Sequence, residues 1–107
     1  MRLKGKKCIV TGGSSGIGEA TVRRFISEGA EVLIADINLD DSKKLSEEIG
    51  EGIDYIKCDV RLEDDIISVS EKAYGMWDQV DVLVNNAGSE LNPVSYTHLT
   101  LPTILLV

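Results

Sequence analysis

The chain has 107 residues, enough for one small domain, and its 43% hydrophobic and 27% charged residues are typical of a soluble globular protein. The net charge of −7 argues against nucleic-acid partners and anionic membranes, because both bind to basic surfaces. No apolar run reaches the 18 residues of a membrane span, and the run after the basic N-terminus stops at Val10, too short for a signal-peptide core, so we expect a cytoplasmic protein.

Apolar runs alternate with segments of helical period, which predicts a parallel α/β sheet. Residues 7–11 are predicted to form a short buried strand. Residues 16–28 are predicted to form a helix that Gly29 closes. The expected inner face of this helix consists of Ile17, Ala20, Thr21, Phe25 and Ile26.

The alternation continues with a strand at residues 31–36 that is apolar on both faces. Asn38 and Asp41 resemble a capping box, which predicts a helix from there to Ile49 with Gly50 beyond it. Further strands are predicted at residues 54–59 and 80–85, and a helix at 63–74. Its inner side consists of Ile66, Ile67, Val69, Ser70 and Ala73.

This βαβαβαβ pattern predicts a doubly wound sheet of strand order 3-2-1-4, with a ligand crevice at the carboxyl ends of strands 1 and 4. Residues 89–107 have no clear place in the pattern. We expect the outer edge of the fourth strand, residues 82–84, to be unpaired, and such an apolar edge favours aggregation over stable folding.

Two cysteines and two aromatic residues have competing interpretations. Cys8 and Cys58 are open to a disulfide, a metal pair or two buried small hydrophobes. Each lies in an apolar run and no ligand pair has zinc-type spacing, so we expect buried thiols and no metal. Tyr74 and Trp77 are expected to pack rather than bind a ligand. The acidic clusters at residues 40–41 and 63–65 begin helices, where negative charge suits the helix dipole.

A glycine-rich loop joins the first strand to the first helix: Thr11-Gly12-Gly13-Ser14-Ser15-Gly16-Ile17-Gly18. Glycines let a backbone approach a pyrophosphate closely, and N–H groups at the helix N-terminus bind its charge. The serine hydroxyls can add hydrogen bonds or cap the helix. The spacing is Gly-x-x-x-Gly-x-Gly, and no Lys-Ser or Lys-Thr pair follows as in a P-loop. A turn that merely connects strand to helix is the alternative, which its place after the first strand disfavours.

The loop and three further segments resemble the short-chain dehydrogenase/reductase family, whose members carry Thr-Gly-x-x-x-Gly-x-Gly after strand 1. The further segments end strands 2, 3 and 4, and they are Asp36, Asp59-Val60 and Asn85-Asn86-Ala87-Gly88. The resemblance covers residues 1–88. It implies a partial, truncated Rossmann-type sheet that binds NAD in the front half of a homo-oligomeric oxidoreductase. That parent enzyme would transfer hydride between NAD(H) and a small alcohol or ketone.

The resemblance also implies a role for each segment. The Asp36 carboxylate would accept hydrogen bonds from the adenosine ribose hydroxyls and repel a 2′-phosphate, unless it merely caps a strand end or a helix. Ile37 stands where phosphate-binding relatives often place Arg, and Ser15 is not basic either, which favours NAD over NADP. Asp59 would meet the adenine amino group, and Val60 would contribute its backbone. Asn86, Ala87 and Gly88 would border the cofactor's ribose and steady the central strand. The expected cofactor-binding residues are Gly12, Ser14, Ser15, Gly16, Ile17, Gly18, Asp36, Ile37, Asp59, Val60, Asn86, Ala87 and Gly88.

No catalytic residue is assigned. The family acts with a Ser, a Tyr-x-x-x-Lys pair and an Asn, and Tyr96 follows Gly88 too soon and has Thr100 where the lysine would stand. Ser95 and His98 flank this tyrosine, but no ordered third member or nucleophile elbow makes them a hydrolase triad. We therefore expect the chain itself to be inactive.

The C-terminal residues of the chain have a possible coding sequence that resembles adapter DNA. Residues 94–103 can be encoded by GTC TCT TAT ACA CAT CTG ACG CTG CCG ACG, which resembles the transposon end and adapter of sequencing libraries. A natural loop that permits this back-translation is the alternative. We expect residues 1–92 to be the N-terminal part of a dinucleotide-binding domain and residues 93–107 to be a non-native tail.

Two other functions are weighed beside this one. A small non-catalytic NAD-binding or sensing module predicts that the tail is native and the domain is stable. A nucleotide-sugar epimerase would share the fold, but such enzymes usually show Gly-x-x-Gly-x-x-Gly.

Overall fold

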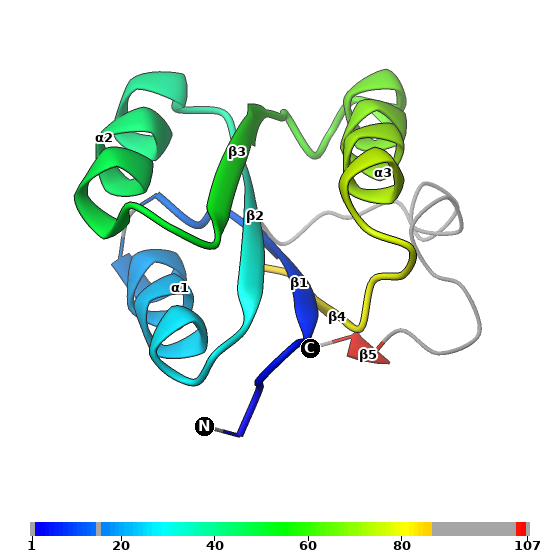
Figure 1. Ribbon diagram of the computed structural model, residues 1–107. Helices are drawn as coiled ribbons and strands as arrows, with labels where there is room; N and C mark the ends of the chain where they lie inside the picture. The colour runs from blue at the N-terminus through cyan, green and yellow to red at the C-terminus, as the bar shows by residue number, and fades with distance from the viewer. Residues whose placement is uncertain (1, 15, 87–104, 107) are drawn as a thin grey trace.

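A parallel sheet with helices on both faces makes up the part of the chain that the computed structural model describes, residues 2–14, 16–86 and 105–106 (Figure 1). In chain order its elements are β1 (Lys7–Thr11), α1 (Gly16–Ser27), β2 (Glu31–Asp36), α2 (Leu39–Ile49), β3 (Ile53–Lys57), α3 (Glu63–Met76), β4 (Val82–Val84) and β5 (Leu105–Leu106). The strand order is β3-β2-β1-β4-β5, and each neighbouring pair is parallel. The predicted order of the first four strands, 3-2-1-4, is confirmed.

The outer edge of β4 is paired at Val82 and Leu83, so the expectation of a bare edge is wrong at these two residues. Leu105 and Leu106 lie in register with Val82 and Leu83. An apolar strand edge carries unpaired N–H and C=O groups that favour any extended segment able to reach it. β5 provides such a segment.

Two strands are shorter than predicted. β3 ends at Lys57 rather than Asp59, because the N–H of Asp59 donates to the carboxylate of Asp65 at 2.9 Å and turns the chain toward α3. β4 is limited to Val82–Val84, the three residues in register with β1.

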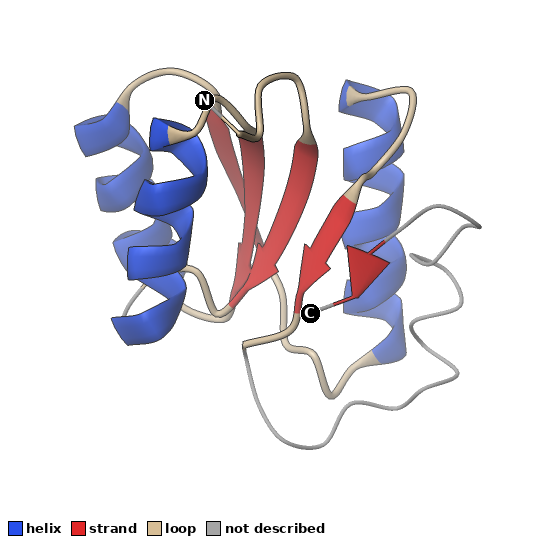
Figure 2. Ribbon diagram, turned by 90° about the horizontal axis from the view of Figure 1, so that it is seen from below, coloured by secondary structure: helices blue, strands red, loops and turns tan. Residues whose placement is uncertain are grey.

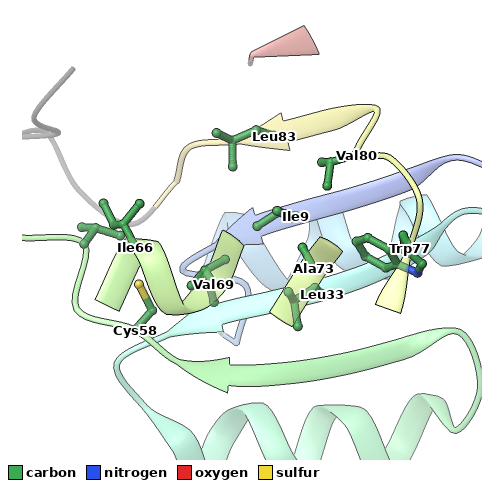
Figure 3. Packing of buried hydrophobic residues seen from close by; sticks show 11 residues of the cluster. Ile9, Leu33, Cys58, Ile66, Val69, Ala73, Trp77, Val80 and Leu83 are labelled. Atoms are coloured by element: carbon green, nitrogen blue, oxygen red, sulfur yellow. The ribbon is translucent and has the colours of Figure 1, made fainter. Parts of the chain in front are cut away.

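Alternate residues of each central strand supply two separate cores, because successive side chains point to opposite faces. Figure 2 shows α1 and α2 on one face of the sheet and α3 on the other. Toward α3 the sheet presents Ile9, Leu33 and Leu83, which pack with residues of that helix (Figure 3). Toward α1 and α2 it presents Cys8, Val10, Val32, Ile34, Val82 and Val84. This two-sided burial explains why the strands are apolar without alternation.

The inner face of α1 agrees with the prediction at Phe25 and Ile26, which pack against the core, and differs from it elsewhere. Ile17 is 77% exposed and Ala20 is also exposed, whereas Val22 is completely buried. Gly18 is buried too, because the helix approaches the glycine loop closely at this position. That approach fixes the rotation of the helix and leaves Ile17 exposed.

The predicted start of α2 is confirmed in detail. The side-chain oxygen of Asn38 accepts from the N–H of Asp41 at 3.0 Å, and its amide donates to the Asp41 carboxylate at 2.8 Å. At the other end Gly50 has φ of +93°, and its N–H donates to the Ser46 carbonyl. Such a cap suits glycine because other residues rarely adopt positive φ.

Both cysteines are free and buried, as expected, and they lie in the two different cores. Trp77 is also buried in the core under α3 (Figure 3). Tyr74 is partly buried and packs against the same core, so the predicted packing roles of both residues are confirmed. Within the described residues, no helix is long and apolar enough to cross a membrane.

Candidate functional site

The candidate site lies at the carboxyl edge of the sheet, where β1 runs into the glycine loop. The N–H of Gly12 donates to the carbonyl of Ala35 in β2 at 2.8 Å, which continues the β1–β2 ladder by one bond into the loop. Gly12 then turns with φ of +65°, a conformation that favours glycine. The loop therefore leaves the sheet abruptly and returns to begin α1 at Gly16.

A close contact fixes how α1 meets this loop. A Cβ on Gly18 would stand 1.9 Å from the carbonyl oxygen of Gly12 and 2.7 Å from the side-chain nitrogen of Asn86. No side chain fits there. The glycine spacing thus lets the N-terminus of α1 lie against the loop, and N–H groups at such a terminus favour an anion.

The carboxylate of Asp36 is fastened to the glycine loop. Its Oδ2 accepts from the N–H of Ser14 at 3.0 Å and from the Ser14 hydroxyl at 2.5 Å, and both residues are only 6% exposed. Its Oδ1 accepts from the N–H of Asn38 at 2.9 Å, beside the start of α2. The end of β2, the loop and the start of α2 are thereby held as one unit. The Ser14 hydroxyl therefore bonds to Asp36, and its expected hydrogen bond to a phosphate stays a prediction.

The end of β4 is tied to the same loop through Thr11. The Thr11 hydroxyl donates to the carbonyl of Val84 at 3.2 Å and accepts from the N–H of Asn86 at 2.9 Å. The Asn86 side chain donates to the Gly12 carbonyl at 3.2 Å. The sequence analysis did not assign Thr11 a role, although it precedes the first glycine of the motif and is 3% exposed.

Asp59 lies in the turn after β3 and forms an ion pair with Arg61, called the Arg61 fork because two guanidinium nitrogens bond to the two carboxylate oxygens. The Asp59 Oδ1 accepts from the Arg61 backbone N–H at 3.0 Å and from its Nε at 2.9 Å, and Oδ2 accepts from Nη2 at 2.8 Å. These bonds lower the pKa of Asp59 to about 2, so its carboxylate is ionised at neutral pH. Nothing in the sequence pattern pointed to Arg61. The side chain of Val60 is buried in the core under α3.

Exposed apolar side chains surround this edge. Four of the large hydrophobic residues with high exposure follow a strand's carboxyl end or begin the helix after it: Ile17, Ile37, Leu39 and Leu62, which are 77%, 56%, 44% and 52% exposed. Isolated exposed hydrophobics are ordinary, but a gathering at one edge marks a surface that a partly apolar ligand would cover. A carboxylate, backbone donors at a helix N-terminus and an apolar rim together suit a nucleotide.

Three of the expected site residues, Ser15, Ala87 and Gly88, lie outside the described residues, as do Ser95, Tyr96 and His98. The remaining expected residues all lie at the carboxyl edge. In the described ranges, no group of three His, Cys, Asp or Glu residues could hold a metal ion. The acidic clusters stand in the first turns of α2 and α3, as predicted.

A family model and the similar curated proteins point to the same family. The family model described as short chain dehydrogenase matches residues 6–103. Tropinone reductase-like 1 of Erythroxylum coca is 44% identical over 87 residues, which cover 81% of this chain and 32% of that protein. The chain spans about a third of the length of the curated relatives it matches.

Two solved structures share the fold. A 3-ketoacyl-(acyl-carrier-protein) reductase from Brucella melitensis, complexed with NADH, superposes with a TM-score of 0.78 at 31% identity, covering 91% of this chain and 43% of that one. A hydroxysteroid dehydrogenase from Escherichia coli gives a TM-score of 0.81 at 34% identity, with coverages of 92% and 48%. The match over nearly the whole sequence shows that this chain belongs to the short chain dehydrogenase family.

Proposed function

We propose that the chain binds NAD(H) at the carboxyl edge of its sheet, as the cofactor-binding part of an oxidoreductase. The observation that carries this proposal is the buried Asp36 carboxylate, fastened to the glycine loop through Ser14 at 3.0 and 2.5 Å. It puts an acceptor for ribose hydroxyls beside backbone donors for a pyrophosphate, which is the pairing that dinucleotide sites of doubly wound sheets use.

The proposed contacts follow the cofactor from its phosphates to its adenine. The loop and the first turn of α1 would hold the pyrophosphate, and Asp36 would hold the adenosine ribose. Ile37 and Asp59 would flank the adenine, with the Val60 backbone beneath it, and the segment after β4 would border the second ribose. The residues so proposed are Gly12, Ser14, Ser15, Gly16, Ile17, Gly18, Asp36, Ile37, Asp59, Val60, Asn86, Ala87 and Gly88.

Electrostatics favours NAD over NADP in this proposal. A 2′-phosphate would stand against the Asp36 carboxylate in a nearly buried position, where like charges repel strongly. Ile37 next to it offers no positive charge. Arg61 lies at the same edge, but its guanidinium is already paired with Asp59. The NADH in the Brucella reductase structure supports the same choice.

The whole enzyme would interconvert an alcohol and a ketone, since named relatives are reductases and dehydrogenases. NAD(H) supplies or takes up the hydride. We propose that residues 1–92 form the cofactor-binding part, that residues 93–107 are not native, and that this chain alone is inactive. The parent enzyme would be a cytoplasmic homo-oligomer, and its substrate pocket would lie outside this chain.

One observation favours the non-catalytic module instead. β5 lies within residues 93–107 and pairs with β4, as a native tail would. Removing residues 93–107 separates the two ideas. The module predicts a large loss of stability, whereas a non-native tail predicts unchanged NADH affinity and stability in urea unfolding.

Titration calorimetry of the chain with NADH and with NADPH tests the proposed function. We expect NADH to bind more tightly. A variant with Asp36→Ala and Ile37→Arg should lose or reverse that preference, because the repulsion is gone and a phosphate partner is present. Asp40→Ala, which changes the net charge by the same amount as Asp36→Ala at an exposed site, should keep it. Equal affinities in the unaltered chain would overturn the assignment.

A further inference from the structure

A cavity of about 210 Å³ opens at the amino edge of the sheet, the edge opposite the candidate site. It lies between the starts of β2 and β3 and the end of α3, and its lining includes Glu31, Gly52, Ile53, Asp54, Met76 and Trp77. None of these residues belongs to the proposed cofactor site. An engineered cavity of about 150 Å³ holds benzene, so this one has room for a ring with a short polar group.

The sheet side of the cavity is acidic. Glu31 lies two residues before Leu33 in β2, and Asp54 is in register with Leu33, so both point to the face of the sheet that α3 covers. Their carboxylates form ion pairs with Lys7 and with Lys72, the latter at 3.2 Å. The two negative charges are thus balanced by two positive ones, while the carboxylate oxygens keep lone pairs for further donors.

The helix side of the cavity has an indole proton without an acceptor. The Trp77 ring packs in the core under α3 and its side chain is only 7% exposed, yet within the described residues its Nε1–H makes no hydrogen bond. In Figure 3 the indole nitrogen lies at the end of the ring away from Ala73 and Leu33. A buried indole N–H usually has a partner, so a molecule in the cavity that brings an acceptor would satisfy it.

We propose that this cavity is a second binding site, for a small uncharged carboxamide with an apolar body. The carboxamide oxygen accepts from the Trp77 Nε1–H, and its own N–H donates to the carboxylate of Glu31 or Asp54. The apolar body covers Met76, which is 40% exposed. Trp77 keeps its packing role in the core and offers the ligand only its N–H.

The two sides of the cavity together select against charged ligands. A carboxylate ligand brings an acceptor for the indole but has no proton for the acidic side, where it also adds a like charge. An ammonium ligand has protons for the carboxylates but leaves the indole N–H unsatisfied. This site goes beyond the proposed function, because it lies at the other edge of the sheet and needs no cofactor.

Three probes of one carbon skeleton test the site in the full chain: phenylacetamide, phenylacetate and phenylethylammonium. Trp77 is the single tryptophan, so one indole peak in a ¹H–¹⁵N NMR spectrum reports on this cavity alone. We expect phenylacetamide to move that peak and the amide peaks of Gly52 and Ile53, with a Kd of about 1 mM. The other two probes should each bind about fivefold more weakly, the value of one hydrogen bond.

Variants test the two sides separately, with the Gly52 and Ile53 amides as reporters. Trp77→Phe keeps a ring in the core but has no N–H, so phenylacetamide should weaken about fivefold and lose its advantage over phenylethylammonium. The double variant Glu31→Gln and Asp54→Asn changes only half-exposed side chains, so it should fold normally and bind phenylacetate as well as phenylacetamide. Met76→Ala is the control, which should weaken all three probes alike because it removes apolar contact only.

An indole peak that does not move in millimolar phenylacetamide would overturn the proposal. So would equal affinities of the three probes, which would mean an apolar hollow without recognition. Shifts gathered at Gly12 and Gly18 would overturn it as well, because they would place the probe at the cofactor edge. None of these results would touch the proposed NAD(H) site, and failure of NADH to bind would leave the carboxamide site standing.

Discussion

The carbonyl oxygen of Gly12 leaves no room for a side chain on Gly18, where a Cβ would stand 1.9 Å away. The same oxygen accepts a hydrogen bond from the Asn86 side chain at 3.2 Å. Three segments, the loop after β1, the first turn of α1 and the end of β4, therefore meet at one backbone atom. The glycine at position 18 is therefore needed for the packing of these three segments against one another, as well as for the approach of a ligand.

Replacing Gly18 with Ala should destabilise the fold by about 3 kcal/mol, because a backbone oxygen cannot move aside without breaking this junction. Gly75→Ala is the matched control. No atom lies within 4 Å of a Cβ at Gly75 in α3, so that change should add about 0.5–1 kcal/mol through helix propensity. Urea unfolding of the two variants measures both, and equal stabilities would contradict the packing account.

The order of strands and helices was predictable because each buried strand is a continuous apolar run and each helix has caps or periodic faces. Asn38 and Asp41 predicted the start of α2 correctly, since capping depends only on residues close in sequence. The loop and Asp36 were predictable for a similar reason. A phosphate-binding loop lies between the first strand and the first helix, and the carboxylate ends the second strand, so both positions follow once the strands and helices are predicted.

What the sequence could not reveal depends on contacts between distant segments. The close approach of Gly18 to Gly12 sets the rotation of α1, which buries Val22 and exposes Ile17. The spacing of apolar side chains carries no information about a contact between two glycine backbones, so it could not predict this rotation. The Arg61–Asp59 fork is a surface pair with no periodic signal. β5 has two residues, too few to show a period.

Replacing Asp36 with Asn should destabilise the chain by about 1–3 kcal/mol even without a ligand. An amide has one acceptor oxygen. Whichever way it is turned, either the buried N–H of Ser14 or the part-buried N–H of Asn38 loses its partner. Asp40→Asn, at an exposed position, should change stability by less than about 0.5 kcal/mol. Urea unfolding compares the two, and a similar midpoint for both would show that these bonds do not stabilise the fold.

Both thiols should be inert in the folded chain. Burial, with a smaller effect from nearby carboxylates, raises the pKa of Cys8 to about 11 and that of Cys58 to about 12, from an ordinary 9.0. Little thiolate then exists in mildly alkaline buffer, and thiolate is the reactive form. A disulfide reagent should label neither thiol until urea unfolds the chain, and it should then label both. Because the folded state disfavours the thiolates, stability should fall as pH rises above 9.0. Rapid labelling of Cys58 in the native chain would contradict its burial.

The ion pair between Arg61 and Asp59 should make a small part of the chain's stability vary with pH in the acid range. Hydrogen bonds from Arg61 lower the pKa of Asp59 from 3.8 to about 2. A carboxyl group whose pKa is depressed by folding stabilises the fold above its unfolded pKa and loses that effect as the pH falls through its folded pKa. The contribution should therefore be complete above a pH of about 4 and gone near 2, and it should be small because the Arg61 side chain is 72% exposed.

Arg61→Ala removes this fork, so the pKa of Asp59 should rise toward 3.8, and Arg61→Lys should lie between because an ammonium cannot pair in two places. Carboxyl NMR titration measures the pKa directly. Arg24→Ala is the matched control, since Arg24 is 73% exposed and pairs with Glu28 instead. The difference in Tm between the unaltered chain and Arg61→Ala should shrink to nothing between pH 4 and pH 2, while the Asp59 pKa in Arg24→Ala stays near 2. An Asp59 pKa that does not move in Arg61→Ala would show that Arg61 does not hold this carboxylate in solution, and Asp59 would then be free to meet the adenine without it.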